Sequence, residues 1–595
     1  MEVSSHQASS NVDLKMVYDA IVVGSGAAGG MATYILANHG LKVLLLEAGK
    51  QQDLTKELHS MEWPYDHPRR GMLPPNDHAL TRNEYTIRKP PYAKGMTYNH
   101  VYSYVENWNG ADYSKNIVVD EKENPYTGTP YAWVRARLLG GKTAIWGRLA
   151  LRLSDYDFKA ASRDGFGMDW PISYSDIAPY YDRVDRLLGI SGHKENLPQM
   201  PDGIFQRAIR LNPGEVKLRE SMIEHGKMLT PYRAGVMTDQ LKHAKYRSHC
   251  FGRGACSRHV GGCDINAAFS SPAALIYPAM DTGNVTVRTN ATVHEITVDP
   301  NTGKASGVSF IDSQTRQTYQ AKGKAVLLGA STLETARIML LSKSRQHPNG
   351  IANSSNQVGH NFCEHIMGPG ITGLVKDLVG KPRTLDDGRP GGFYVPRFRN
   401  IKEKSSKFLR GYGYEGGSGC TMIPGNAFST SGFGSAYKKQ VRDQAGAFID
   451  MGAFGEMLPR YENYVAIDPN VKDRWGIPVL KFHISYGDNE KAMAKDMAET
   501  AQEIFKDAGI EIVSVNHDIL PVGWSIHELG TSRMGNDPKT SVVNSFQQCH
   551  DVKNLLCVDG STHVSASAQN PTWTIMALCM RSCDHLADQL KKGEI

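Results

Sequence analysis

Three glycines at the spacing G-x-G-x-x-G carry the first recognisable chemistry of the chain. Gly24, Gly26 and Gly29 directly follow the apolar run 17–23, which is typical of a buried strand. Glycine at the first position allows a tight turn, at the second a close approach of the backbone to a pyrophosphate, and at the third close packing of helix on strand. The helix after the turn would offer its free N–H groups to phosphate. The spacing therefore predicts a phosphate-binding turn.

The residues after this turn complete a dinucleotide-binding unit. A helical pattern extends from Met31 to about Asn38, and a second apolar run, 42–46, ends at Glu47. A carboxylate at that position accepts hydrogen bonds from ribose hydroxyls. Strand, turn, helix, strand and acid in this order predict a βαβ unit that binds a dinucleotide, and the Ala-Gly pair after the acid favours FAD over NAD.

A second glycine-rich stretch, residues 137–147, contains Gly140, Gly141 and Thr143. Adjacent glycines let successive N–H groups wrap an anion or the edge of a ring. The same residues would also suit a turn between two domains, so this stretch alone leaves both interpretations open.

A third stretch with possible chemistry lies near the C-terminus. The apolar run 555–558 leads into Asp559 and Gly560, and a helical pattern begins after Asn570 and Pro571. Asn is a good N-cap, and Pro suits the first helical position, where the N–H has no partner. The positive end of that helix dipole would suit the pyrimidine edge of a reduced flavin.

These stretches need a sheet that holds them together. Residues 285–288 and 291–296 alternate as strands, and 325–330 is a buried strand that leads into a helix over 332–341. We expect them to extend the nucleotide-binding sheet.

A second region offers elements for a substrate. Alternating runs at 464–467 and 479–484 predict an antiparallel sheet. Two stretches rich in glycine and aromatic residues, 411–417 and 428–437, fit either a mobile sugar-binding lid or an ordinary loop.

Composition bounds the class of protein. The chain has 595 residues, a net charge of only +6, and no basic run, which argues against nucleic-acid binding. It also contains no long apolar run that would predict a membrane span. Residues 1–15 are polar and lack the apolar core of a secretory signal. We expect a cytoplasmic protein, and export to the periplasm together with a signal-bearing partner stays open.

Three of the nine cysteines, Cys250, Cys256 and Cys263, cluster in a glycine-rich loop. Three thiolates could hold an iron–sulfur cluster, but their spacing is not a ferredoxin run and no fourth ligand is evident. We therefore expect a reduced, packed loop and no metal site.

Together these motifs resemble the glucose–methanol–choline (GMC) oxidoreductase family. Within it the chain is most similar to the sugar-oxidising branch, which contains bacterial glucoside 3-dehydrogenases and enzymes of the pyranose 2-oxidase type. One departure is His360, which stands where the family usually has arginine. The matching stretches follow the family's order across nearly the whole chain: 24–29 with Glu47, 140–143, 329–336, 358–365, 527–535 and 558–572.

The resemblance implies roles for particular residues. His527 would be the base that takes the hydroxyl proton, Asn570 would orient the same hydroxyl, and flavin N5 would take the hydride. An imidazole pKa near 6.5 suits that base at neutral pH. His563 is expected to be structural, and is the next candidate base. No histidine lies beside the glycine pair in 143–146, so we expect non-covalent FAD. The predicted cofactor-binding residues are Gly24, Gly26, Ala27, Ala28, Gly29, Glu47, Gly140, Gly141, Thr143, Val293, Asp559, Gly560, Pro571 and Thr572.

The predicted fold is an α/β, Rossmann-like FAD domain interleaved with an α+β substrate domain on an antiparallel sheet. The expected FAD domain comprises 16–50, 131–155, 250–345 and 520–595, the substrate domain 160–249 and 360–519, and an excursion and lid region 51–130.

Three functions stay open from the sequence. The first is a dehydrogenase that oxidises a secondary hydroxyl of a sugar or glycoside, with C3 of a glucoside preferred. Its electrons would pass to a quinone or to a partner such as a c-type cytochrome, with a small subunit as a further partner. The second is an oxidase that reduces O2, and the third is a redox-silent flavoprotein such as a lyase or a scaffold subunit.

Overall fold

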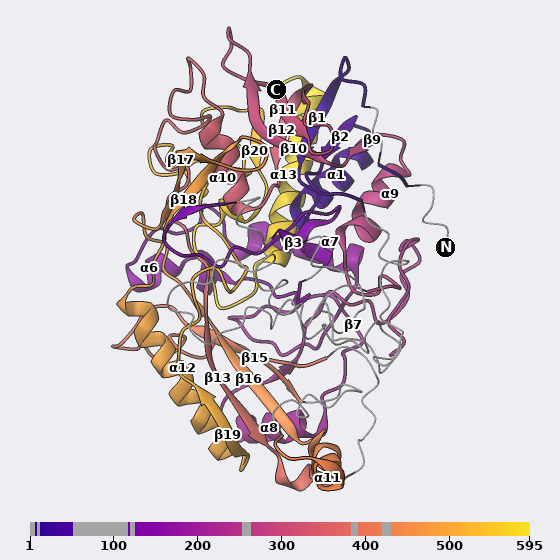
Figure 1. Cartoon of the computed structure of the whole chain (residues 1–595). Coiled ribbons are helices and arrows are strands. Elements are labelled where there is room, and N and C mark those ends of the chain that lie inside the picture. The colour runs from indigo at the N-terminus through magenta and orange to yellow at the C-terminus, as the bar shows by residue number, and fades with distance from the viewer. Residues whose placement is uncertain are drawn as a thin grey trace.

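Two sheets lie at opposite ends of an elongated molecule (Figure 1). The computed structural model describes residues 6–8, 12–51, 117–118, 125–144, 146–252, 263–381, 391–418 and 430–595. Most of the predicted excursion and lid region, 51–130, lies outside the described residues.

The first sheet has seven strands and joins both ends of the chain. Its central strands pair in parallel and are buried on both faces, which explains their uninterrupted apolar sequence. Two antiparallel strands extend one side, and the strand nearest the C-terminus pairs with the last residues of β12. The order is β10 (Ala291–Val298), β11 (Ala305–Asp312), β12 (Thr318–Leu328), β1 (Val17–Val23), β2 (Val43–Leu46) and β9 (Val285–Arg288), with β20 (Leu555–Cys557) beside β12.

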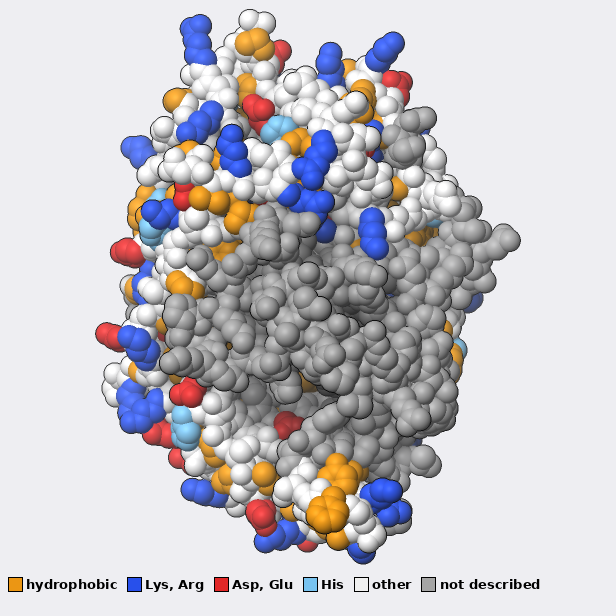
Figure 2. All heavy atoms as spheres, in the orientation of Figure 1, with side chains coloured by type: hydrophobic (Ala, Val, Ile, Leu, Met, Phe, Trp, Pro, Cys, Tyr) orange, Lys and Arg blue, Asp and Glu red, His pale blue; other side chains and the backbone are white. Residues whose placement is uncertain are grey.

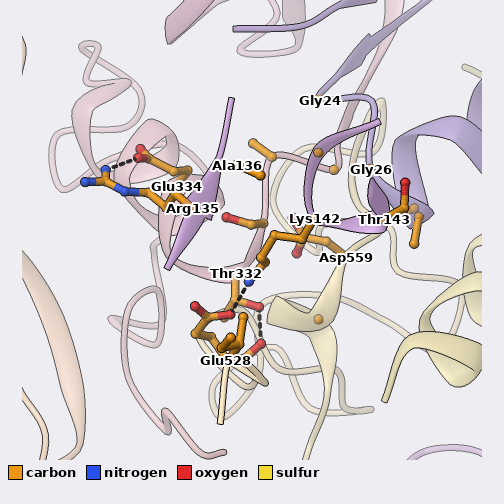
Figure 3. A pocket seen from close by; sticks show the side chains of 18 of the residues that line it. Gly24, Gly26, Arg135, Ala136, Lys142, Thr143, Thr332, Glu334, Glu528 and Asp559 are labelled. Atoms are coloured by element: carbon orange, nitrogen blue, oxygen red, sulfur yellow. Dashed lines mark hydrogen bonds and ion pairs between the residues drawn. The ribbon is translucent and has the colours of Figure 1, made fainter. Parts of the chain in front are cut away.

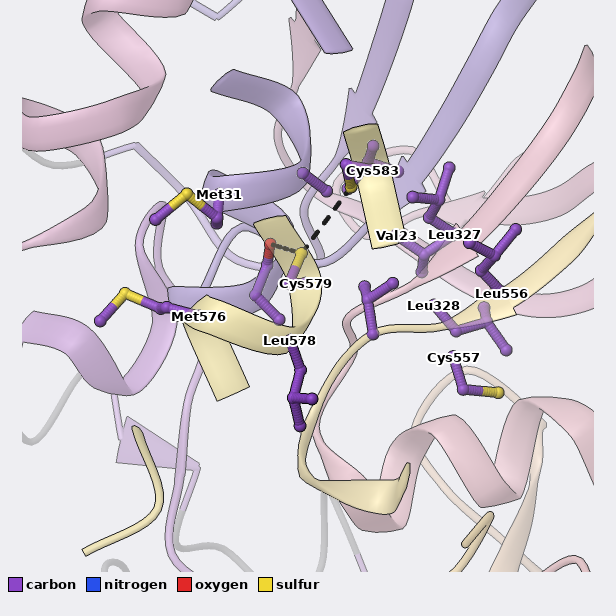
Figure 4. Packing of buried hydrophobic residues seen from close by; sticks show 14 of the residues in the cluster. Val23, Met31, Leu327, Leu328, Leu556, Cys557, Met576, Leu578, Cys579 and Cys583 are labelled. Carbon is purple, nitrogen blue, oxygen red and sulfur yellow. Dashed lines mark hydrogen bonds between the residues drawn. The ribbon is translucent and has the colours of Figure 1, made fainter. Parts of the chain in front are cut away.

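Two helices from opposite ends of the chain cover this sheet together. Helix α1 (Ala27–Asn38) packs against α13 (Thr572–Lys592), and Met31 and Cys579 lie in the shared core (Figure 4). The Cys579 thiol also approaches the carbonyl oxygen of Ala28 at 3.2 Å. The first βα unit is therefore completed by residues close to the C-terminus.

The second sheet is antiparallel throughout its six strands. Helix α12 (Asp488–Asp507) packs on it and fills its core. Its strands are, in order, β19 (Glu511–Asn516), β13 (His365–Leu374), β16 (Phe448–Glu456), β15 (Tyr412–Ser418), β14 (Phe393–Val395) and β8 (Thr230–Pro231). A Rossmann-like sheet combined with an antiparallel one confirms the predicted fold class.

The interpretation of residues 411–417 as a lid or loop is wrong, because 412–417 belong to strand β15. Glycine is needed there because the adjacent strands β14 and β16 leave no room for side chains. A Cβ on Gly413 would lie 2.5 Å from the Tyr394 hydroxyl, and one on Gly416 would lie 2.3 Å from the Asp450 carbonyl oxygen. The other expected lid, 428–437, begins outside the described residues and continues into α11 (Gly434–Gln444).

The alternating runs at 464–467 and 479–484 pair antiparallel as predicted, but in a separate small sheet. Strand β17 (Tyr464–Lys472) pairs with β18 (Pro478–His483), which also pairs in parallel with β4 (Thr127–Gly128). Helix α10 (Thr332–Leu341) packs against β17 and so links this sheet to the first one.

The remaining described elements are short connections and surface helices. Helix α7 lies within the range 160–249 yet packs on α13, and the Tyr181 hydroxyl lies 2.6 Å from that of Thr574. The domain boundaries stay a prediction. The elements are β3 (Ile117–Val118), β5 (Arg135–Ala136), η3 (Gly141–Ala144), α5 (Asp155–Phe158), α6 (Ala160–Asp164), α7 (Tyr174–Leu188), β6 (Ile190–Ser191), β7 (Phe205–Gln206), α8 (Pro213–Glu224), η4 (Pro272–Ile276), α9 (Tyr277–Met280), η5 (Lys376–Leu378) and η7 (Gly560–Thr562).

Basic, acidic and hydrophobic side chains are interspersed over the described part of the face in Figure 2. Among the described residues, no helix combines the length and the apolar character needed to cross a membrane.

Candidate active site

A cavity of about 480 Å³ is lined by residues from both sheets and from both ends of the chain. This volume lies within the range of about 300–1,000 Å³ that is usual for cofactor and small-molecule sites. The predicted catalytic residues His527 and Asn570 both line it. Gly29 and Gly140 are outside the lining, whereas the other predicted cofactor residues belong to it: Gly24, Gly26, Ala27, Ala28, Glu47, Gly141, Thr143, Val293, Asp559, Gly560, Pro571 and Thr572.

The three glycines of the first turn differ in the space around them. A Cβ on Gly24 would lie 2.4 Å from the carbonyl oxygen of Gly329, and one on Gly29 would lie 1.8 Å from that of Gly24. A Cβ on Gly26 would meet nothing within 4 Å. Gly24 and Gly29 therefore allow close packing of backbone, while Gly26 leaves its backbone open toward the cavity.

Two helices begin at the cavity with their first N–H groups uncapped by side chains. Helix α1 begins after Gly26, and α13 begins after Pro571, with no acidic residue in either first turn. Helix N-termini carry partial positive charge and unpaired N–H donors, so both suit an anion. A pyrophosphate at one and an electron-rich ring edge at the other fit this arrangement.

The second glycine stretch faces the first, which favours the cofactor-loop interpretation over a turn between domains. A Cβ on Gly141 would lie 3.6 Å from the Cα of Gly26. Gly140 positions this loop by donating its N–H to the Ser25 hydroxyl at 2.8 Å. The Thr143 hydroxyl donates to the carbonyl oxygen of Gly140 at 2.6 Å and so closes the turn.

Glu47 holds Ser25 of the first turn, the residue whose hydroxyl accepts from Gly140 of the second loop. Its carboxylate accepts hydrogen bonds from the Ser25 N–H at 3.0 Å, from the Ser25 hydroxyl, and from the Gly49 N–H at 2.8 Å. Burial raises the pKa of Glu47. The residue lines the cavity, and its contact with a ribose stays a prediction.

Sequence reasoning missed an ion pair beside the catalytic candidate. Lys142 Nζ lies 2.6 Å from Glu528 Oε2, and the hydroxyl of Thr332 donates to the Glu528 carbonyl oxygen (Figure 3). The Glu528 side chain is only 5% exposed. The pair connects the second glycine loop to the residue after His527. A lysine in that loop was the only sequence signal for it.

Sequence reasoning also missed three arginines that line the cavity, Arg135, Arg137 and Arg337. Arg135 pairs with Glu334 at 2.9 Å (Figure 3), and Arg337 pairs with Asp473 at 2.8 Å. Although burial alone would raise it, the pKa of Glu334 is lowered to about 2, because the charges of Arg337, Arg135 and Arg137 outweigh desolvation. The guanidinium of Arg137 lies over the Trp475 ring, 4.3 Å from its centroid.

His527 lies deep in the protein, with part of its ring open to the cavity. Its Nδ1 is 3.0 Å from Nδ1 of His365, a contact that the sequence motifs did not single out. The preceding residue, Ile526, has φ +60°, a region that β-branched residues rarely adopt. Burial, then the charges of His365 and Lys142, lowers the pKa of His527 well below 6.5. The expectation of an ordinary imidazole pKa is therefore corrected.

The prediction that Asn570 caps the last helix is wrong. Helix α13 starts at Thr572, and Pro571 occupies the cap position without a side-chain cap. The Asn570 side chain is instead oriented by the buried carboxyl group of Glu415, to which its amide N–H donates; Glu415 is another residue that sequence reasoning missed. Desolvation raises the pKa of Glu415 to about 7. The Oδ1 atom of Asn570 is buried and has no protein partner.

His563 does not line the cavity. It is buried against Trp170, with ring centroids 5.0 Å apart, and desolvation lowers its pKa to about 3. Its environment is that of the predicted structural histidine.

The question of an iron–sulfur cluster lies partly outside the described residues, because Cys256 is not among them. Across the described ranges, no group of three or more His, Cys, Asp or Glu side chains could hold a metal ion.

The geometry fits a dinucleotide such as FAD. The open backbone at Gly26 and the two uncapped helix ends meet its requirements for phosphate and ring edge. Residues 18–367 and 459–579 match the N-terminal and C-terminal parts of the GMC oxidoreductase family.

This chain is similar to known proteins over nearly its whole length. The 2-methyl-1,2-propanediol dehydrogenase of Mycolicibacterium austroafricanum is 28% identical, over 96% of this chain and 95% of the relative. The fructose dehydrogenase large subunit of Gluconobacter japonicus is 25% identical, over 97% and 98%. The crystal structure of pyridoxine 4-oxidase from Mesorbium loti shares the fold, with a TM-score of 0.57 and 14% identity over 96% of this chain and 99% of that one. The chain therefore belongs to the GMC oxidoreductase family and is an FAD-dependent oxidoreductase that acts on CH–OH groups.

Proposed function

We propose that the chain oxidises a secondary hydroxyl of a sugar or glycoside, with C3 of a glucoside as the position, to give the 3-keto sugar. The observation that carries this proposal is that His527 and Asn570 line one cavity together with the two glycine loops. A histidine–asparagine pair is what the resemblance to the sugar-oxidising branch implies. The similarity to fructose dehydrogenase supports a sugar, while the similarity to a propanediol dehydrogenase makes a small diol the alternative to test.

The residues of the site divide the work of removing two hydrogens from the alcohol. The hydroxyl proton passes to the free ring nitrogen of His527, which is neutral because its pKa is lowered by burial. Asn570, held by Glu415, orients the hydroxyl oxygen. Bound FAD supplies the acceptor for the hydride from the carbon that bears this hydroxyl. Loss of the proton and the hydride leaves a carbonyl group. Lys142, paired with Glu528, is close enough to His527 to disfavour its protonation.

The test is anaerobic reduction of the purified holoenzyme's flavin. We expect glucosides to bleach the visible flavin band and simple diols to do so poorly. A matched pair, a methyl glucoside and its 3-deoxy analogue, addresses the position, because only the first has a C3 hydroxyl. Bleaching by both would reject C3, and bleaching by diols alone would reject the sugar.

The pH dependence of the same step follows from the lowered pKa of His527. The neutral imidazole is the reactive form, and its pKa lies well below 6.5. The rate of flavin reduction at saturating substrate should therefore stay level across neutral pH and fall only in acid, as pH drops through the lowered pKa. A rate that rises through pH 6.5 would contradict this environment for the base.

We further propose that FAD is held non-covalently and that electrons leave to a partner protein or quinone. Non-covalent binding is supported by residues 143–146, which offer no histidine to bond the flavin. A partner protein is supported by the fructose dehydrogenase relative, which is the large subunit of its enzyme. Acid precipitation should leave the yellow cofactor in solution, and yellow pellets would overturn the first point. Slow reoxidation of the reduced enzyme by air would support a dehydrogenase, whereas rapid reoxidation would identify an oxidase.

A further inference from the structure

His365 and His527 form a buried pair in which only one proton fits between the two rings. The Nδ1 atoms are 3.0 Å apart, and the ring planes are inclined at 75°. His365 comes from the start of β13 and is 1% exposed. Phe454 from β16 packs near both rings, at centroid distances of 6.3 and 6.2 Å. One histidine of the pair must donate and the other accept, because two bare or two protonated Nδ1 atoms would repel each other.

The two possible arrangements differ in what His527 presents to the cavity. If His527 carries its proton on Nδ1, it donates to His365, and its Nε2 is a bare acceptor. If His365 donates instead, His527 carries its proton on Nε2 and cannot accept one from a substrate. A neutral imidazole has a single N–H, so the hydrogen bond at one nitrogen decides the state of the other.

The surroundings of His365 favour the first arrangement. With Nδ1 engaged by His527, only Nε2 remains, and this atom is buried without a partner in good hydrogen-bond geometry. The backbone of Ser567 interacts with the His365 ring and acts to raise its pKa, as a carbonyl oxygen facing a ring N–H does. A proton on Nε2 is attracted by that backbone oxygen, whereas a bare lone pair would be repelled. Both rings are held neutral because burial lowers their pKa values, that of His365 to about 4.

We propose that His365 is a positioning residue that fixes His527 in the tautomer protonated on Nδ1, and so leaves Nε2 free to accept the substrate's proton. The connection continues from Ser567 to Asn570, three residues later in the same loop. One segment therefore carries Asn570 and, through His365, sets the protonation state of His527. The proposal deepens the proposed function and rests on His527 being its base.

The first experiment needs no substrate. Holoenzyme labelled with ¹⁵N in its histidines is studied at pH 7, and the two pairs of signals are assigned by their loss in His365→Asn and His527→Asn. We expect His527 to show a protonated Nδ1 and a bare Nε2, and His365 to show the reverse. The opposite pattern, or a mixture of both, would overturn the proposal even if no sugar reduces the flavin.

The second experiment compares three variants by anaerobic flavin reduction. His365→Leu removes the acceptor and should slow reduction by about 10²-fold or more, within the range of about 10²–10⁴-fold that base catalysis contributes. His365→Asn places an amide oxygen where Nδ1 stood and should recover most of that rate. His360→Leu is the matched control, because His360 stacks on Tyr461 outside the cavity lining.

A purely structural role for His365 predicts a different result. In that case flavin reduction would be equally slow in His365→Leu and His365→Asn, or the variants would lose substrate binding and FAD retention as much as turnover. Either outcome would overturn the proposal. If the wild-type flavin is not reduced by any sugar or diol, the proposed function fails, and the nitrogen spectrum still decides the tautomer.

Discussion

The two halves of the site are built on opposite principles. In the half that we propose to bind phosphate, Gly24, Gly26 and Gly29 leave space through the absence of side chains, and all three lie within six consecutive residues. In the half that we propose to be catalytic, the side chains of His365 and His527 meet across 162 residues of sequence. The first half depends on space for backbone, and the second depends on burial that keeps imidazoles neutral. Changes in the first should therefore alter cofactor binding, and changes in the second should alter the rate.

The largest expected effect is that of His527→Ala on the rate. Flavin reduction by substrate should fall by about 10²–10⁴-fold or more, because the proton acceptor is lost. FAD should stay bound, because the glycine cradle is untouched. Rapid-mixing spectroscopy measures the rate, and the FAD content measures retention. His360→Ala serves as the control. Reduction at nearly the wild-type rate would remove His527 as the base.

The glycines allow a test within the binding half. Gly26→Ala adds a methyl group that meets no protein atom within 4 Å, so the protein should fold and bind FAD more weakly. Gly29→Ala would place its Cβ 1.8 Å from the Gly24 carbonyl oxygen, so it should lower stability first. Thermal unfolding of the apoprotein and FAD titration separate the two effects. Equal loss of stability in both variants would contradict the assigned difference.

His563 sharpens the comparison, because it is a buried neutral imidazole outside the cavity. Its folded pKa is about 3, below the ordinary value near 6.5, so below pH 6.5 the unfolded chain binds a proton that the folded protein does not. This histidine therefore removes stability as pH falls. Replacement by Phe should abolish that loss, and the stability of His563→Phe relative to wild type should rise by about 2 kcal/mol between pH 7 and 5.

Urea denaturation at the two pH values measures this difference. Buried acids with raised pKa values, such as Glu364 at about 8, act in the opposite direction, but they are common to both proteins and cancel. His563→Phe should also be at least as stable as wild type at pH 7, since both ring nitrogens lack partners. A difference that does not change with pH would mean that His563 is already accessible to protons.

The smallest expected effect concerns Ile526, whose φ of +60° is unfavourable for a β-branched residue. Ile526→Gly should be about 1 kcal/mol more stable than Ile526→Ala, because glycine adopts this region without strain. Both variants lose the same packing of the larger side chain apart from one methyl group. Denaturant unfolding of the two proteins measures the gap. An alanine variant as stable as the glycine variant would show that the backbone relaxes there.

Local features of the fold were predictable from sequence, and long-range ones were not. Helix 332–341 and the strand 285–288 are observed at the predicted residues, because each follows from a short pattern of apolar side chains. Residues 411–417 misled, because a glycine-rich strand has the composition of a loop, and its glycines are explained only by neighbours such as Tyr394.

The same division holds in the site. The glycine turns could be read from spacing because backbone geometry is local. The prediction of a cap at Asn570 was wrong because its side chain is oriented by Glu415, 155 residues earlier, and its Oδ1 accepts from no helix N–H. The pKa of His527 and its contact with His365 depend on burial and on a partner strand, and neither leaves a signal in the surrounding residues.

The pairing of α1 with α13 has a consequence for the order in which the protein is made. Asp559, which lines the cofactor cavity, follows Gly24 by 535 residues. At about 5–20 residues per second, a ribosome needs roughly half a minute to two minutes between them. During that interval strand β12 is without its neighbour β20, and the face of α1 that α13 covers is without its final partner. Cofactor loading is therefore a late event in biogenesis, and truncated nascent chains should emerge colourless.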